Sequence, residues 1–467
     1  MTIKKQNFIG TFIWLIIALF EYLYLAGIYD YYSVLVSVAW LGIVNIVLQI
    51  LIWKSTDQGI LSPFMVFIYC SYIFHFGQII MTGIFPNVEF SYLNYITVYM
   101  SNHVVSIKTM KVIVNCINMI YLGGLFGSGL ISSQDITEMS SSDIESSKNE
   151  MLRIAKILMI VSFPLRLFID LQTLAAAVVG GYYAAIAVSY SGIVDCIAGF
   201  WYSAVILYYL GLDDRKKKRR FLLFVVTYLL VVMLTGNRGH QMVCLLMLFI
   251  VVYADRNKKF SLKTVIGAIL LMYGGMIVID FIYTMREAGI SYFFSNIGAV
   301  TGESLRANIL FETIGSFGET IFTPYLVIEG IDGGNINPGF GECFYKSLVS
   351  IFPSITSTMA RINTEANFPK MLNTWSAIGG SIVGEMYYNF RHLYGLFSVV
   401  VGVFLSRISS NISKGLVNKN YNVLLYAIPI FTNLVWWCRD SISNAVRSIV
   451  WICCFIWILK RVIAKKS

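Results

Sequence analysis

The chain has 467 residues, of which 57% are hydrophobic and only 13% are charged. Its mean hydropathy is +0.71 and its formal net charge is +10. A water-soluble protein does not need so much apolar surface, so these values exclude a soluble enzyme and predict an all-α, polytopic membrane protein. The eight cysteines form no CxxC pair, and the chain has no HExxH, P-loop or dinucleotide-binding glycine motif. No metal and no cofactor are therefore expected.

The positive charge marks the loops expected in the cytoplasm. Lys and Arg lie mainly in short segments between apolar runs, most densely in DDRKKKRR at 213–220. Cytoplasmic loops of membrane proteins carry such an excess. This pattern explains the basic balance without a nucleic-acid partner, and none is expected. It also predicts that the N- and C-termini are both cytoplasmic.

The apolar runs predict one polytopic domain over residues 1–467. Nine spans are expected near residues 8–27, 33–53, 60–83, 110–131, 153–177, 192–212, 220–235, 241–254 and 262–284. Three more are expected near residues 393–411, 420–436 and 443–461. This gives about 12 spans. The Ser- and acid-rich segment 132–152 is predicted to be a flexible cytoplasmic linker, and 285–392 a large external loop.

The stretch 375–392, WSAIGGSIVGEMYYNFRH, ends this external loop. On a helix, it would place four polar or aromatic residues on one face: Ser381, Glu385, Tyr388 and His392. A carboxylate in so apolar a stretch is costly unless it is paired, protonated or used. Counting positive loops favours a re-entrant or half-helix element here, lining a cavity. The alternative is that 375–392 crosses together with the apolar run 344–355, which would give 14 spans.

Four pieces that are distant in the chain are predicted to meet on the outer side. They are GNRGH (236–240), FETIGSFGET (311–320), the stretch from Glu385 to His392, and CRDS (438–441). An arginine at the outer edge favours an anionic partner, and its guanidinium fork suits a diphosphate. Each residue also has a structural interpretation: Arg238 as an interfacial anchor, Arg439 and Asp440 as an ion pair within a turn.

A second charged pair lies inside an apolar run. Arg166 and Asp170 are four residues apart in the span expected at 153–177, so they can pair within the bilayer. An internal ion pair and a role along a substrate path are both open.

Three segments resemble the bacterial repeat-unit polymerases of O-antigen and capsular polysaccharide, often called the Wzy type. The segments are TGNRGHQMVCLLMLFIVVY (235–253), GGSIVGEMYYNF (379–390) with Gly395, and RDS (439–441). Family members resemble this chain in having many spans, a large external loop and a Gly-Arg-Gly-like turn. They often have glycine after the Asn-Phe pair, whereas Arg391 and His392 follow it here. No family role is carried onto those two residues.

The resemblance implies a membrane glycosyltransferase on the outer face of the bacterial cytoplasmic membrane. A sugar hydroxyl of one polyprenyl-diphosphate-linked oligosaccharide would attack the anomeric carbon of another, and the lipid diphosphate would leave. Arg238 and Arg439 are the first candidates to stabilise this diphosphate without a metal, and Arg391 is a candidate on its charge. Glu385 is the first candidate for the general base, followed by Glu319 and His240. The supporting candidates are Ser381, Tyr388, Asn389, His392 and Asp440.

The implied partners are the lipid-linked oligosaccharides and membrane lipids, with a chain-length-determining membrane protein and a flippase as further candidates. Two alternative functions remain. A ligase that moves a finished glycan to another acceptor would use the same donor chemistry. A transporter of lipid-linked saccharides needs ionisable groups near the midplane, whereas the predicted cluster lies at the outer side.

Overall fold

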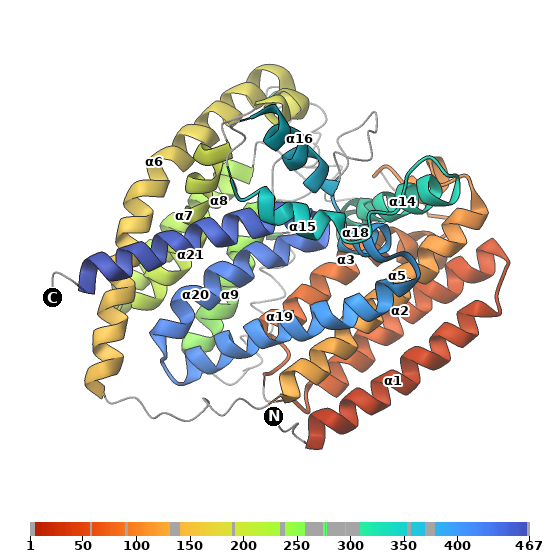
Figure 1. Ribbon diagram of the computed structural model, residues 1–467, viewed down its shortest axis with the longest axis horizontal. Coiled ribbons are helices and arrows are strands. Elements are labelled where there is room, and N and C mark those ends of the chain that lie inside the picture. The colour runs from red at the N-terminus through yellow and green to blue at the C-terminus, as the bar shows by residue number, and fades with distance from the viewer. Residues whose placement is uncertain are drawn as a thin grey trace. The chain divides into compact units, whose positions relative to one another are not determined.

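The computed structural model describes residues 5–56, 58–88, 92–130, 141–188, 192–233, 239–256, 309–352, 356–368 and 379–464, with 274, 275, 277 and 295. Every regular element among these residues is a helix, which confirms the all-α prediction for them (Figure 1). The chain divides into two compact units, and the single polytopic domain stays a prediction. The first unit holds residues 1–139, 314–414 and 433–447, and the second holds residues 140–313, 415–432 and 448–467.

Eight helical segments of the described chain are long and apolar enough to cross a membrane. They are α1 (Lys5–Ala26), α2 (Tyr31–Trp53), α3 (Pro63–Ile84), α5 (His103–Gly129), α7 (Gly192–Gly211), the run Ile382–Val417, α20 (Tyr421–Val435) with the 3-10 turn η3 (Trp436–Arg439), and α21 (Ile442–Ala464). They coincide with the first four, the sixth and the last three predicted spans. A multi-pass membrane protein is thus confirmed.

The remaining predicted spans fall on other elements. They correspond to parts of α6 (Ser141–Ala187), α8 (Arg215–Met233) and α9 (Gly239–Arg256). Apart from residues 274, 275 and 277, the span expected at 262–284 lies outside the described residues, so the total of 12 stays a prediction. Helix α6 begins inside the segment predicted as a linker, with Asp143 in its first turn, where a carboxylate stabilises the positive end of the helix dipole. Residues 131–140 lie outside the description.

Helix α19 (Tyr394–Val417) packs against α5 through glycines. A Cβ atom on Gly402 would lie 1.9 Å from the carbonyl oxygen of Ile120, and one on Gly123 would lie 2.0 Å from that of Val399. Small residues at such positions let two membrane helices approach backbone to backbone. The two glycines therefore fix the line along which α19 runs against α5.

Gly402→Ala is expected to lower the free energy of unfolding by about 1–3 kcal/mol, because the added methyl group must push the two backbones apart. Thermal unfolding of the detergent-solubilised protein measures the change. Gly199→Ala in α7 is the matched control, since no atom lies within 4 Å of the Cβ position there. Equal melting temperatures for the two variants would contradict the close packing.

One end of the first unit gathers the helix ends that the loop charges assign to the cytoplasm. Asn7, near the start of α1, donates to Ser128 near the end of α5 at 2.7 Å. The backbone N–H of Phe64, at the start of α3, donates to the Ser409 hydroxyl of α19 at 3.0 Å. Lys54 at the end of α2 and Lys414 in the last turn of α19 belong here, and Arg407 of α19 donates to the Leu130 carbonyl after α5.

The other end of the first unit carries the loops predicted to be external. The rings of Tyr31 and His103, at the starts of α2 and α5, stack with centroids 4.2 Å apart. The short helix α4 (Tyr95–Val98) lies in the connection between α3 and α5. Helix α14 (Phe322–Asp332) joins this end, because Lys108 of α5 forms an ion pair with Asp332 at 2.7 Å.

The second unit contains α6 to α9 and most of α20 and α21. In α6, Arg166 Nε donates to both oxygens of Asp170 at 2.9 Å, so the predicted internal ion pair is confirmed. The hydroxyl of Tyr228 in α8 donates to the same carboxylate at 2.5 Å. The Arg166–Asp170 pair therefore links α6 to α8. This structural role accounts for the pair without a role along a substrate path.

Candidate active site

A short helix, α18 (Ile382–Phe390), stands where the sequence suggested a helical face over 375–392. Ser381 caps it, since its hydroxyl accepts a hydrogen bond from the N–H of Gly384 at 3.2 Å. Serine is favoured at this position because its oxygen satisfies a free backbone donor. Residues 375–378 lie outside the described part of the chain.

The helix ends at Arg391, where φ is +42°. A non-glycine residue with positive φ is uncommon and breaks the helix. Arg391 and His392 start the 3-10 turn η2 (Arg391–Leu393) and are both exposed. The expectation that His392 shares a helical face with Glu385 is therefore wrong.

The last carbonyls of α18 are satisfied by the turn before α15 (Glu342–Val349). The N–H of Gly339 donates to the Tyr388 carbonyl at 2.9 Å, and that of Gly341 to the Asn389 carbonyl at 3.1 Å. The Asn389 side chain accepts from the N–H of Cys343 at 3.0 Å, and the Tyr388 hydroxyl donates to Glu342 at 3.2 Å. Tyr388 and Asn389 thus hold α18 to the loop that follows α14.

Helix α15 is clasped in turn to α16 (Ser357–Ala366). Lys346 of α15 forms ion pairs with Glu342 and, at 2.6 Å, with Glu365 of α16. The hydrogen bond from Lys346 lowers the pKa of the Glu365 carboxyl. The ion pairs of Lys346 therefore hold together α15 and α16, two described parts of the predicted external loop that lie next to α18.

The carboxylate of Glu385 is fully buried and surrounded by donors. Oε2 accepts from the indole N–H of Trp437 at 2.5 Å and from the backbone N–H of Ile442 at 3.1 Å. Oε1 accepts from the Ser441 hydroxyl at 3.3 Å. Buried carboxylates need such hydrogen bonds to offset the loss of hydration. Glu385 therefore ties α18 to the turn 437–442, which contains the CRDS sequence.

Arg439 lies in this turn and faces the 3-10 turn η1 (Gly318–Ile321). Its guanidinium lies 3.6 Å from the carboxylate of Glu319, and both side chains are largely buried, with 20% and 15% exposed. The same guanidinium sits 5.6 Å from the centre of the Phe74 ring. The structure thus brings together Arg439, Glu319 and Glu385, which the sequence placed in three separate pieces.

Asp440 completes the turn without pairing to Arg439. Its Oδ1 accepts from the N–H of Ser441 at 2.7 Å and from the side-chain amide of Asn444 at 2.9 Å. Gly380 packs on the Asp440 backbone, and a Cβ there would lie 2.3 Å from the Asp440 carbonyl carbon. The Gly-Gly pair therefore has a steric role, because the absence of side chains lets the turn 437–442 pack against the start of α18.

Sequence reasoning missed His75 of α3, which is fully buried beside this cluster. Its Nδ1 lies 2.9 Å from the Ser71 carbonyl oxygen, and its Nε2 lies 2.8 Å from the Ser381 hydroxyl. A carbonyl oxygen only accepts, so Nδ1 carries the proton and Nε2 accepts from Ser381. The signal was a lone histidine inside an apolar span, which marks a functional candidate.

The cluster lies beside the middle of α3. Cys438 is 3.3 Å from Ser71, eight residues after Pro63, and His75 follows four residues later. At a rise of 1.5 Å per residue, these contacts lie about 12–18 Å along a helix about 33 Å long. Loop charges predicted the CRDS sequence at the outer edge. That location stays a prediction, and the contacts of Glu385 hold the turn beside the middle of α3.

Two of the other predicted residues, His240 and Glu312, belong to the second unit. His240 begins α9 in the second unit, where its ring stacks 5.7 Å from that of Tyr202. Glu312, in α13 (Ile309–Phe317), also belongs to the second unit. Arg238 lies outside the described residues. Within the described chain, no three His, Cys, Asp or Glu side chains are grouped as a metal site would need.

Comparison with protein families matches residues 10–467 to O-antigen polysaccharide polymerase Wzy. The chain belongs to this Wzy family. No curated protein and no solved structure matches it significantly. The resemblance inferred from three short motifs is confirmed over essentially the whole chain.

Membership of the Wzy family gives the buried cluster its chemical context. The family acts as a polymerase of the O-antigen type, a glycosyltransferase-like activity on lipid-linked oligosaccharide units in membranes. The motif carrying Glu385 and the RDS motif were the two C-terminal pieces of the resemblance. In the structure they bond to each other directly, because the Ser441 hydroxyl donates to Glu385.

Proposed function

We propose that the chain polymerises polyprenyl-diphosphate-linked oligosaccharide repeat units on the outer face of the bacterial cytoplasmic membrane. The observation that carries the proposal is the Arg439–Glu319 pair, held beside the Glu385-bound turn in a chain of the Wzy family. A cation and a carboxylate in contact supply the two charges that glycosyl transfer from a diphosphate requires.

In the proposed step, a hydroxyl of the incoming unit attacks the anomeric carbon of the growing glycan. The new glycosidic bond forms as the bond to the lipid diphosphate breaks. Negative charge develops on the departing diphosphate, where Arg439 stabilises it, and no metal is required for this role. The hydroxyl proton passes to a carboxylate.

We propose Glu319 as that carboxylate. When the diphosphate binds Arg439, the guanidinium exchanges partners and Glu319 is released to accept a proton. Both side chains are partly exposed, as substrate contact requires. Glu385, the first candidate from sequence, has both oxygens bound to donors of the chain, which suits a positioning residue.

The remaining candidates keep proposed roles of different weight. Arg238 and His240 stay proposals from sequence alone, as a second diphosphate ligand and an alternative base. Arg391 is exposed at the break after α18 and could contact an anion only from the surface. Ser381, Tyr388, Asn389 and Asp440 are proposed to hold α18 and the turn through the hydrogen bonds described above.

Purified full-length protein in lipid vesicles, supplied only with lipid-linked repeat units, is expected to produce a ladder of longer glycans. Gel electrophoresis of the products measures the ladder. A transporter would move the units without joining them, and a ligase would need a preformed polymer and a different acceptor. Absence of any product longer than one repeat would refute the proposed polymerisation.

A further inference from the structure

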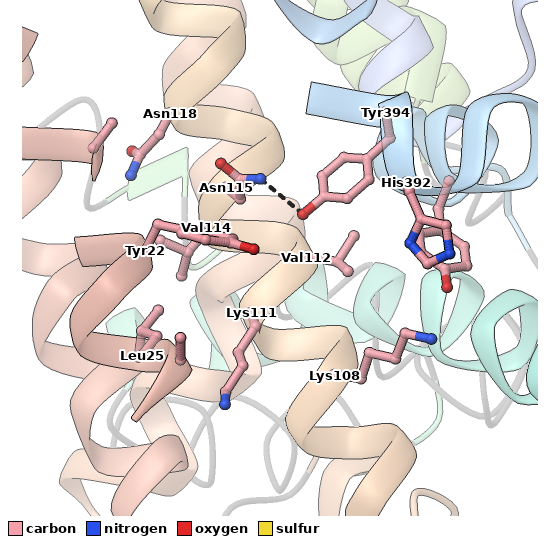
Figure 2. Close-up of a pocket in the computed structure, with 13 residues that line it drawn as sticks. Tyr22, Leu25, Lys108, Lys111, Val112, Val114, Asn115, Asn118, His392 and Tyr394 are labelled. Atoms are coloured by element: carbon pink, nitrogen blue, oxygen red, sulfur yellow. Dashed lines mark hydrogen bonds between the residues drawn. The ribbon is translucent and has the colours of Figure 1, made fainter. Parts of the chain in front are cut away.

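A pocket of about 220 Å³ opens in the first unit, apart from the Glu385 cluster. Figure 2 shows its wall, built from side chains of α1, α5 and the residues around the start of α19. Asn115 of α5 donates to the hydroxyl of Tyr394 at 2.9 Å and closes one side. Tyr22 and Leu25 of α1 form the facing wall.

Two cations and no carboxylate line this pocket. Lys108 and Lys111 both come from α5, and in Figure 2 the Lys108 ammonium lies on the side of His392, whereas the Lys111 ammonium points towards the side of α1. Lys108 also pairs with Asp332, and Lys111 donates to the backbone oxygen of Ile28 at 2.7 Å. Lys108 donates to both oxygens of Asp332, so its charge is offset. An ammonium group has three donors, so Lys111 retains two for a further acceptor. The lining therefore favours an anion.

The pocket lies at the end of a helix that is expected to border lipid. Lys111 bonds to Ile28, two residues beyond the last residue of α1, a candidate membrane span. Many apolar side chains of α1 are exposed, including Leu19, Phe20 and Leu23. Lysines at the end of a span place their charge at the membrane surface. An anion held here would be at the depth of lipid phosphates.

We propose that this pocket binds the phosphate or diphosphate head group of a lipid, with the lipid chain lying along α1. Its volume is below the roughly 300–1,000 Å³ of pockets that enclose a drug-sized ligand, so it suits a head group and leaves a saccharide outside. Given the proposed function, the lipid is the second of the two polyprenyl-diphosphate-linked substrates. The Arg439 cluster then serves the first.

Photocrosslinking of the full-length protein in vesicles tests the site with a photoreactive long-chain polyprenyl diphosphate. Labelling of peptides around residues 18–28 and 108–118 is expected, and mass spectrometry locates it. Lys111→Gln is expected to reduce this labelling about tenfold, and Ala26→Trp, which fills the pocket rim without changing charge, to reduce it similarly. Lys54→Gln removes the same charge at the opposite end of the unit and should leave labelling unchanged.

Competition identifies the source of the phosphate. Unlabelled polyprenyl diphosphate should remove the label, whereas excess phosphatidylglycerol or inorganic diphosphate should not. Equal competition by phosphatidylglycerol would overturn the assignment of the ligand as a substrate. Equal competition by inorganic diphosphate would overturn the proposal that the ligand is a lipid. Unchanged labelling in both pocket variants would overturn the site itself. Labelling requires no polymerisation, so a protein that binds here but forms no polymer would refute only the proposed function.

Discussion

Arg439→Ala should abolish long-chain polymer while leaving the amount of protein in the membrane unchanged. Removing one fixed donor to a developing oxyanion typically lowers kcat by roughly 10²–10³-fold. Arg439 is largely buried beside Glu319 and Phe74, so water does not replace its charge at full strength. Initial rates with lipid-linked repeat units measure the loss.

Two further variants separate the role of Arg439 from a general charge effect. Arg439→Lys keeps the charge but loses the fork that binds two phosphate oxygens, so partial activity is expected. Arg361→Ala is the matched control, because Arg361 pairs with a glutamate at 3.5 Å but is 73% exposed. Normal chain length in Arg439→Ala would remove this residue from the proposed site.

The membrane spans were largely predictable because length and apolarity alone specify them. α1, α2, α3 and α5 fall where the first four apolar runs lie, and α19 follows the predicted break after 392. In lipid, backbone groups must be satisfied within the segment, so a long apolar run has few other structures available. Loop charges likewise indicated which helix ends share one side of the first unit.

The partners of the polar residues were not predictable, because they depend on contacts between distant segments. Glu385 and Trp437 are 52 residues apart, and His75 and Ser381 are 306 apart. No periodicity in the sequence links such pairs. Gly339 likewise satisfies a carbonyl of α18 that lies 49 residues away in the chain, at Tyr388.

The two carboxylates of the cluster differ in what they can do. Glu319 contacts one cation and is partly exposed, so a substrate hydroxyl can approach it. Glu385 is wholly buried, and its oxygens accept from one indole, one hydroxyl and one backbone N–H. A general base must come within hydrogen-bond reach of the proton that it removes. On this contrast we propose Glu319 as the catalytic carboxylate and Glu385 as a positioning residue.

Glu385→Gln should therefore impair activity and stability together. The amide oxygen can keep the N–H donors of Trp437 and Ile442 only if its NH₂ faces the Ser441 hydroxyl, which must then accept instead of donate. The charge-assisted hydrogen bonds become neutral ones, at a cost of about 1–2 kcal/mol. The turn carrying Arg439 would loosen, and the melting temperature and kcat should both fall. Glu319→Gln should lower kcat by roughly 10²–10⁴-fold, the usual contribution of a general base, and by more than Glu385→Gln does. If Glu385→Gln lost more activity than Glu319→Gln at an unchanged melting temperature, Glu385 would be the base and Glu319 only the partner of Arg439.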